Sequence, residues 1–250
     1  MSDAYPIPIL HVTSAGDMGE VAGPLVRDRI ARGVRDSGSC RIGLSGGSTP
    51  GPLLDWLAVH LPEELFSGCK ITWVDERCLP RDTLRPQDDW TSYHADSNAR
   101  LAGARWLGRA RGRARDVLPM CSTGVLEPDQ RVFESAFAER FDQTLDLALL
   151  GAGPDGHIAS LFPGHPGLET SGISLAITDA PKPPPERLSL TMEVLAGSGS
   201  VVLLAKGREK AEVLRRAYEG DMSLPLGRLV REHGHRMHWV LDDAAASQLS

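Results

Sequence analysis

An aspartate and a histidine two positions apart, Asp155 and His157, are the residues of this sequence best suited to acid–base chemistry. They follow the apolar run Leu147–Leu150 and stand among three glycines. An imidazole exchanges protons near neutral pH, and a neighbouring carboxylate can orient it. Taken alone, the triplet Asp155-Gly156-His157 fits a helix-capping aspartate and a surface histidine better than a catalytic pair. Its place after an expected buried strand is, however, where open α/β sheets bind ligands.

A second glycine turn has the composition of a phosphate cradle. It follows the apolar run Cys40–Leu44 and precedes leucines at helical spacing. The turn consists of Ser45, Gly46, Gly47, Ser48 and Thr49. Its glycines let the backbone approach an anion, and its hydroxyl groups add donors beside a helix N-terminus. It lacks the lysine of a Walker loop, and by itself it fits an ordinary loop equally well.

A third group of charged side chains, Asp75-Glu76-Arg77, ends the expected strand Lys70–Val74. Burial of an unpaired charge is costly, so charges at the end of a buried strand need partners. The triplet therefore fits either a binding site or a strand end closed by salt bridges.

The segments that would position these groups alternate between strands and helices. Further strands are expected over residues 7–12, 117–120, 173–178, 201–205 and 237–241, and helices over residues 14–36, 97–107, 129–141 and 208–218. The apolar spacing after His157 also predicts the start of a helix. Such alternation is typical of an α/β fold with a doubly wound, mainly parallel sheet flanked by helices. The simplest interpretation is a single domain over residues 1–250, with a small lobe around residues 180–199.

Two segments stand outside this alternation. Residues 80–96 are polar and rich in turns, and we expect them to form a loop that covers the site as a lid. Residues 100–115 contain six arginines, which could bind nucleic acid. The acidic chain and the lack of interleaved aromatic residues other than Trp106 favour a solvated surface instead.

Composition and charge limit the classes of protein to which this chain can belong. The chain has 250 residues, 41% of them hydrophobic, and a net charge of -6, as in an ordinary globular protein without a nucleic-acid partner. No apolar run is long enough to span a membrane. The early Asp3 and the lack of an apolar leader predict no secretory signal. With four scattered cysteines, these features lead us to expect a cytoplasmic protein.

We expect neither a metal nor an organic cofactor. His233, His235 and His238 fit an exposed polar turn better than a metal site. Gly151 and Gly153 begin a dinucleotide fingerprint, but the third glycine is out of register. We find no nucleophile elbow around any serine.

Six motifs in order resemble those of the glucosamine-6-phosphate isomerase/6-phosphogluconolactonase family, and of its lactonases in particular. They are Leu44–Pro50, Val74–Pro80, Ser97-Asn98, Leu149–Gly164, Asp179–Leu190 and Gly207–Ala211. The resemblance implies a fold similar to that of the sugar-phosphate deaminases and ribose-5-phosphate isomerase. It also implies hydrolysis of 6-phospho-D-glucono-1,5-lactone to 6-phospho-D-gluconate in the oxidative pentose phosphate pathway, without a metal or organic cofactor.

The resemblance suggests a role for each candidate residue in lactone hydrolysis. His157 would be the general base, and Asp155 would orient the imidazole or the attacking water. Arg77 and the backbone N–H groups around Gly156 would stabilise the oxyanion. Asp75 would bind sugar hydroxyl groups.

The phosphate of such a substrate requires cations in addition to the Gly46 turn. Lys210, which matches a phosphate-binding lysine of the deaminases, and Arg187 are the first candidates. Lys206 and Lys182 are the second. Three features depart from the family pattern: a long segment between Arg77 and Ser97, the arginine-rich segment, and Ala205-Lys206 in place of a threonine.

Two other functions remain open. A glucosamine-6-phosphate deaminase would use Asp75 as its base, but Asn-Glu-Pro is expected after the histidine turn, where this chain has Ser160–Pro163. A non-catalytic sugar-phosphate sensor normally carries a helix-turn-helix, for which we find no room before Ser45. The expected partner is a small sugar-phosphate lactone, and the expected state is a monomer or a weak homodimer.

Overall fold

The computed structural model describes residues 6–249, so Asp3 lies outside the described residues. The strands are β1 (Ile9–Thr13), β2 (Cys40–Leu44), β3 (Cys69–Trp73), β4 (Asp75–Arg77), β5 (Asp116–Leu118), β6 (Leu147–Gly151), β7 (Ser174–Ile177), β8 (Arg187–Leu190), β9 (Val201–Ala205) and β10 (Met237–Asp242). The α-helices are α1 (Met18–Ser37), α2 (Gly51–His60), α3 (Glu63–Phe66), α4 (Asn98–Ala102), α5 (Leu126–Phe141), α6 (Met192–Ala196), α7 (Ala211–Tyr218) and α8 (Pro225–His233). Short 3-10 or π turns are η1 (Trp90–Ser92), η2 (Gly103–Leu107), η3 (Pro166–Glu169), η4 (Arg208–Lys210) and η5 (Gly234–Arg236).

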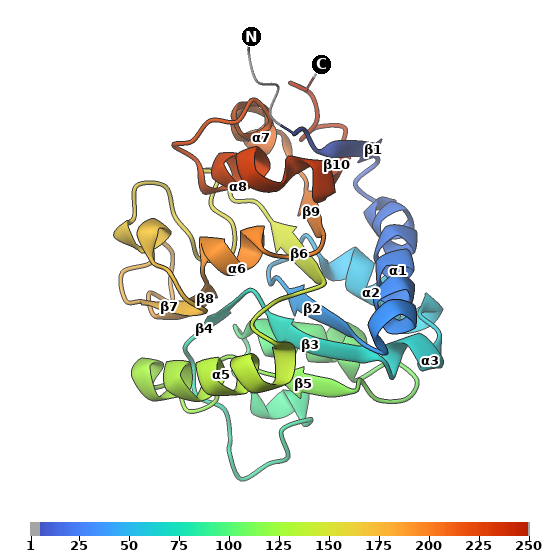
Figure 1. Ribbon diagram of the computed structural model, residues 1–250, viewed down its shortest axis with the longest axis vertical. Helices are drawn as coiled ribbons and strands as arrows, with labels where there is room; N and C mark the ends of the chain where they lie inside the picture. The colour runs from blue at the N-terminus through green and yellow to red at the C-terminus, as the bar shows by residue number, and fades with distance from the viewer. Residues whose placement is uncertain (1–5, 250) are drawn as a thin grey trace.

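Seven strands form one parallel sheet in the order β1-β10-β9-β6-β2-β3-β5. In Figure 1, α1 and α2 stand on one side of this sheet and α6 and α8 on the other. Strands covered on both faces are apolar along their length, as in β9, where every residue is buried. The expected fold class is thus confirmed.

The neighbouring strands β2 and β6 create the crevice on which the site depends. From β2 the chain runs outward through β3 to β5, and it returns on the other side of β2 as β6. At such a reversal the connections leave the carboxyl ends of the two strands in opposite directions, which opens a crevice. The glycine turns after β2 and after β6 border this crevice.

A second, antiparallel sheet in the order β4-β8-β7 contains the charged triplet. The triplet Asp75–Arg77 is therefore a strand of its own, not the end of the strand before it. Val74 makes the connection: its N–H donates to Leu44 of β2, and its carbonyl accepts from Leu190 of β8. This small sheet consists of β4 and β7 in addition to β8, so it extends beyond residues 180–199, around which a small lobe was expected.

The helix expected after His157 is absent, and that prediction was wrong. Residues 152–164 form turns, with a single bridge between Ile158 and Leu161. Starting a helix is costly, and Pro163 and Gly164 end the segment before enough hydrogen bonds could repay that cost. The sequence pattern also gave no prediction for α8.

Residues 80–96 do not line the crevice, which contradicts the expected lid. They form the turquoise loop at the bottom of Figure 1. Its Trp90 packs against Trp73, with ring centroids 6.3 Å apart, and against Gly103, where a Cβ would lie 2.1 Å from the indole. These contacts fix the loop to the large sheet and to η2.

The arginine-rich segment is a solvated surface, as expected. Arg105 and Arg109 both pair with Asp55, and the largely exposed Arg113 pairs with Asp88. None of the described helices is both long and apolar enough to cross a membrane.

Candidate active site

A pocket of about 270 Å³ opens at the carboxyl ends of β2 and β6 and brings the predicted residues together. Those that line it are Ser45, Gly46, Gly47, Ser48, Thr49, Asp75, Arg77, His157, Arg187 and Lys210. Asp155 does not line the pocket but contacts His157. Asn98 and Lys182 also line the pocket, whereas Lys206 does not. Groups from six separate segments of the chain thus converge on one crevice.

His157 and Asp155 form a hydrogen-bonded pair at the pocket wall. The distance from His157 Nδ1 to Asp155 Oδ1 is 2.5 Å, and this hydrogen bond lowers the pKa of Asp155 to about 2. An ionised carboxylate at this distance requires the proton on Nδ1, so the lone pair of His157 lies on Nε2. Gly153 leaves room for the ring, since a Cβ there would lie 2.1 Å from it. The pair is therefore arranged to present a basic nitrogen.

The Gly46 turn joins β2 to α2 and faces the pocket with its backbone. Gly47 has φ 84°, which favours glycine, and a Cβ on Gly46 would lie 1.8 Å from Asn98 Oδ1. Ser45 is buried, and its Oγ has no hydrogen-bond partner among the described residues. A buried hydroxyl without a partner is costly, and a bound anion would satisfy it.

Lys210 and Lys182 bring positive charge to the pocket. Burial lowers the pKa of Lys210, and the charges of Lys206 and Lys182 lower it further, against the opposing effect of Glu209. An anion between these lysines would relieve their repulsion. The second-choice candidate Lys182 is thus better placed than Lys206.

Arg187 lies at the pocket but is largely engaged by the protein. Its Nε donates to Pro184 O at 3.1 Å, and its Nη2 donates to Lys182 O at 3.0 Å. Its Nη1 lies 3.9 Å from Asp75 Oδ2. The buried guanidinium therefore fixes the backbone of Lys182 in addition to adding positive charge.

Asp75 is held in place by hydrogen bonds from its neighbours. Ser160 Oγ donates to Asp75 Oδ2 at 2.7 Å, and Asn98 Nδ2 donates to Asp75 Oδ1 at 3.2 Å. Asn98 Nδ2 also donates to the backbone carbonyl of Asp75 at 2.8 Å. Both oxygens of the carboxylate thus accept a hydrogen bond from another segment of the chain.

Residues 14–239 match the family described as Glucosamine-6-phosphate isomerases/6-phosphogluconolactonase. A 6-phosphogluconolactonase of Homo sapiens is 34% identical over 271 residues, which cover 99% of this chain and 96% of the human protein. The chain belongs to the glucosamine-6-phosphate isomerase/6-phosphogluconolactonase family.

Solved structures agree with this family assignment. The 6-phosphogluconolactonase from Trypanosoma cruzi superimposes with a TM-score of 0.82 at 25% identity, over 100% of both chains. A monomeric glucosamine-6-phosphate deaminase superimposes with a TM-score of 0.74 at 21% identity, over 97% of this chain and 99% of that one. The second likeness shows that the two activities named in the family share a fold.

The sequence patterns did not predict that Asn98 and Ser160 bind Asp75 in the site. Ser97 caps α4 as expected, with its hydroxyl accepting from the N–H of Arg100. The capping pattern draws attention to Ser97, whereas Asn98 makes the contacts in the pocket. Ser160 lies 85 positions from Asp75 in the sequence, so no local pattern could have joined them.

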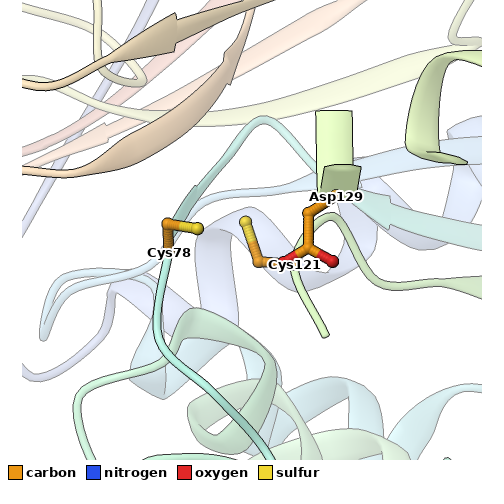
Figure 2. Close-up of side chains that lie close together, drawn as sticks. All are labelled: Cys78, Cys121 and Asp129. Atoms are coloured by element: carbon orange, nitrogen blue, oxygen red, sulfur yellow. The ribbon is translucent and has the colours of Figure 1, made fainter. Parts of the chain in front are cut away.

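A cluster of Cys78, Cys121 and Asp129 lies outside the pocket, and its ligand atoms are all within 4.8 Å of one another. Figure 2 shows the two sulfur atoms facing each other, with Asp129 beside Cys121. The Asp129 carboxylate already accepts from the N–H groups of residues 122–124. The hydrogen bond with Cys78 and burial raise the pKa of Cys121, and the same hydrogen bond lowers the pKa of Cys78. The two thiols and the carboxylate thus form a hydrogen-bonded cluster apart from the pocket.

Of the three C-terminal histidines, His235 lies in the exposed turn η5, as expected, whereas His233 and His238 are placed differently. His233 is buried at the end of α8, and burial lowers its pKa to about 4. His238 lies in β10 and stacks on His11, with ring centroids 5.3 Å apart. Among residues 6–249 these three histidines do not form a metal-binding group.

Proposed function

We propose that this chain hydrolyses 6-phospho-D-glucono-1,5-lactone to 6-phospho-D-gluconate, the hydrolytic step of the oxidative pentose phosphate pathway. The observation that supports the proposal is that His157, paired with Asp155, lines the same pocket as Lys182 and Lys210. The pair suits activation of water, and the lysines suit a phosphate. Family membership agrees with both.

In the proposed reaction, water attacks the lactone carbonyl carbon while His157 Nε2 takes its proton. Asp155 stays ionised and stabilises the imidazolium through the hydrogen bond to Nδ1. The tetrahedral intermediate then expels the ring oxygen, which receives the proton from His157. The product is a carboxylic acid that ionises in solution. His157 thus acts first as base and then as acid, as acyl transfer to water requires.

Arg77 is the proposed donor to the oxyanion. Its Nη1 donates to the backbone carbonyl of Asp96, which fixes the guanidinium, and its Nε has no partner among the described residues. A donor fixed before the reaction stabilises charge that develops in the transition state without further reorganisation. The N–H groups near Gly156 are the second proposed source.

The phosphate is proposed to bind between the Gly46 turn and the lysines Lys182 and Lys210. Backbone N–H groups, the Ser45 hydroxyl and two ammonium groups then surround its oxygens. Arg187 supports this arrangement by fixing Lys182. Asp75 is assigned to hold Asn98 and the small sheet in place, rather than to bind sugar hydroxyl groups.

Turnover of the lactone tests the proposal. The substrate can be made in situ from glucose 6-phosphate, and its spontaneous hydrolysis must be subtracted. We expect a rate clearly above that background and no turnover of glucosamine 6-phosphate, because Ser160–Pro163 stands where a deaminase is expected to have Asn-Glu-Pro. Turnover of glucosamine 6-phosphate alone would assign the chain to the deaminases. Sugar-phosphate binding without turnover would assign it to the sensors.

Replacing Lys210 with alanine is expected to raise KM for the lactone about 10- to 100-fold, since a hydrogen bond to a charged group contributes roughly 1.5–3 kcal/mol. Steady-state kinetics on the purified variant measure this change. Lys206→Ala is the matched control, because Lys206 lies close in sequence but does not line the pocket. If Lys206→Ala raised KM and Lys210→Ala did not, the phosphate would lie elsewhere.

The proposed enzyme acts in the cytoplasm as a monomer or weak homodimer. All four cysteines are free and buried in the structure, which suits a reducing compartment. Every proposed catalytic residue comes from one chain, so the mechanism needs no second copy.

A further inference from the structure

Glu76 is a buried carboxylate at the pocket wall to which the mechanism assigns no role. It is 2% exposed and lies between Asp75 and Arg77, which both line the pocket. It forms no ion pair with any described lysine, arginine or histidine. A buried charge without a cation is costly, so its hydrogen bonds must offset that cost.

The hydrogen bonds of Glu76 tie β4 to the start of α4. Oε1 accepts from Arg77 N and from Asn98 N, each at 2.7 Å, and Oε2 accepts from Ala99 N at 2.8 Å. Hydrogen bonds from N–H groups to a carboxylate are about twice as strong as those between neutral groups. One side chain therefore holds the backbone N–H groups of Arg77 in β4 and of Asn98 and Ala99 at the start of α4.

Asn98, whose backbone N–H is bound by Glu76, connects the start of α4 to two walls of the pocket. Its Nδ2 donates to the carbonyl and to Oδ1 of Asp75, while its Oδ1 rests against Gly46, where even a Cβ would lie only 1.8 Å away. The amide thus joins the wall that carries Arg77 to the turn that is proposed to bind phosphate. A small rotation of α4 would therefore shift both Arg77 and the Gly46 turn.

We propose that Glu76 is a positioning residue of the lactonase reaction: it fixes the start of α4, so that Asn98 holds the Arg77 wall and the Gly46 turn at their working separation. This inference rests on the proposed function. Glu76 does not line the pocket, so it acts through Asn98 and Arg77 and not on the substrate.

The protonation state of Glu76 makes this role dependent on pH. Burial raises the pKa of Glu76 to about 7, and the charge of Asp75 also raises it, while the hydrogen bonds from Asn98, Ala99 and Arg77 lower it. Other titratable groups that interact with it are Arg187, Tyr93, Cys78 and Cys121. As pH falls through about 7, Glu76 takes up a proton and loses an acceptor for one of its three N–H donors.

The first test is Glu76→Gln, which has the same shape but is neutral and places an NH₂ group where an acceptor is needed. We expect kcat to fall about 10- to 100-fold, as for a displacement of up to about 1 Å at the reacting groups. Inhibition by 6-phosphogluconate should weaken less than kcat falls, because Asn98 contacts only the Gly46 turn of the proposed phosphate site, while Lys182 and Lys210 lie on other segments. Asp129→Asn is the matched control, since Asp129 is also a buried carboxylate that accepts backbone N–H groups but does not line the pocket.

The second test is the ratio of wild-type to Glu76→Gln kcat between about pH 8.5 and about pH 5.5, where a group of pKa near 7 changes from charged to neutral. Groups that titrate alike in both proteins cancel in the ratio. We expect the ratio to fall towards one at the acid end, because the wild-type carboxylate is then neutral as well. A ratio that does not change with pH would overturn the proposal.

Asn98→Ala tests the same link if Glu76→Gln does not fold, because it keeps the backbone N–H that Glu76 binds. We expect it to lower kcat. Where Glu76→Gln does fold, we expect the double variant to lose little more than Asn98→Ala alone. Full kcat in either single variant, or an equal loss in Asp129→Asn, contradicts the proposal. A wild-type protein without lactone turnover would overturn the proposed function and this inference together, whereas an active wild type with an unaffected Glu76→Gln overturns only the inference.

Discussion

Replacing His157 with alanine is expected to lower kcat for the lactone about 100- to 10,000-fold, the range in which a positioned acid–base group contributes. The remaining rate should lie close to that of spontaneous opening. The physical reason is the loss of the only proposed group that both accepts the proton of the water and returns it to the ring oxygen. Initial rates after subtraction of the uncatalysed reaction measure this effect.

His165→Ala is the matched control for this experiment. His165 also contacts a carboxylate, with Nε2 at 3.0 Å from Asp179 Oδ1, but it does not line the pocket. It should keep nearly the full rate, and circular dichroism should show that both variants are folded. Full activity in folded His157→Ala would move the base assignment to another group.

Replacing Arg77 with alanine is expected to lower kcat about 100- to 1,000-fold, the loss typical when one oxyanion donor is removed. KM and inhibition by 6-phosphogluconate should change much less, because the phosphate is assigned to other groups. Steady-state kinetics and product inhibition, measured on the same preparation, separate these two effects.

The pattern of change decides between two roles for Arg77. A large rise in KM with an unchanged kcat would mean that Arg77 binds the phosphate instead of the oxyanion. Arg81→Ala is the control, since Arg81 also donates to backbone carbonyls of the 80–96 segment but does not line the pocket. A similar loss of kcat in Arg81→Ala would show that the effect comes from loosening that segment.

Local sequence patterns located most of the candidate site. The Gly46 turn and the His157 turn each follow a buried strand, and their residue types limit the chemistry to anions and proton transfer. That both turns meet follows from strand order alone, because β2 and β6 are neighbours at the point where the sheet reverses. The order of motifs along the chain was sufficient to indicate the family.

Patterns failed where a side chain's role depends on contacts between distant segments. The lid was expected from polarity, but Trp90 and its ring contacts hold the 80–96 segment against η2 and the large sheet. The helix after His157 was expected from spacing, but the run is too short to repay helix nucleation. Hydrophobic periodicity does not show which distant residues a loop packs against. It also does not show whether a helical segment is long enough to be stable.

The sequence by itself indicated the fold class, the family and the two glycine turns, because these depend on residue spacing and on the order of motifs along the chain. It also placed Asp155 and His157 two positions apart in one turn, where they can form a pair. Only the tertiary structure decided that Asp75 is held by Ser160 and Asn98, that Lys182 and not Lys206 reaches the pocket, and that Glu76 fixes α4. Such assignments depend on burial and on donor–acceptor distances between segments far apart in sequence. These quantities exist only once the chain has folded.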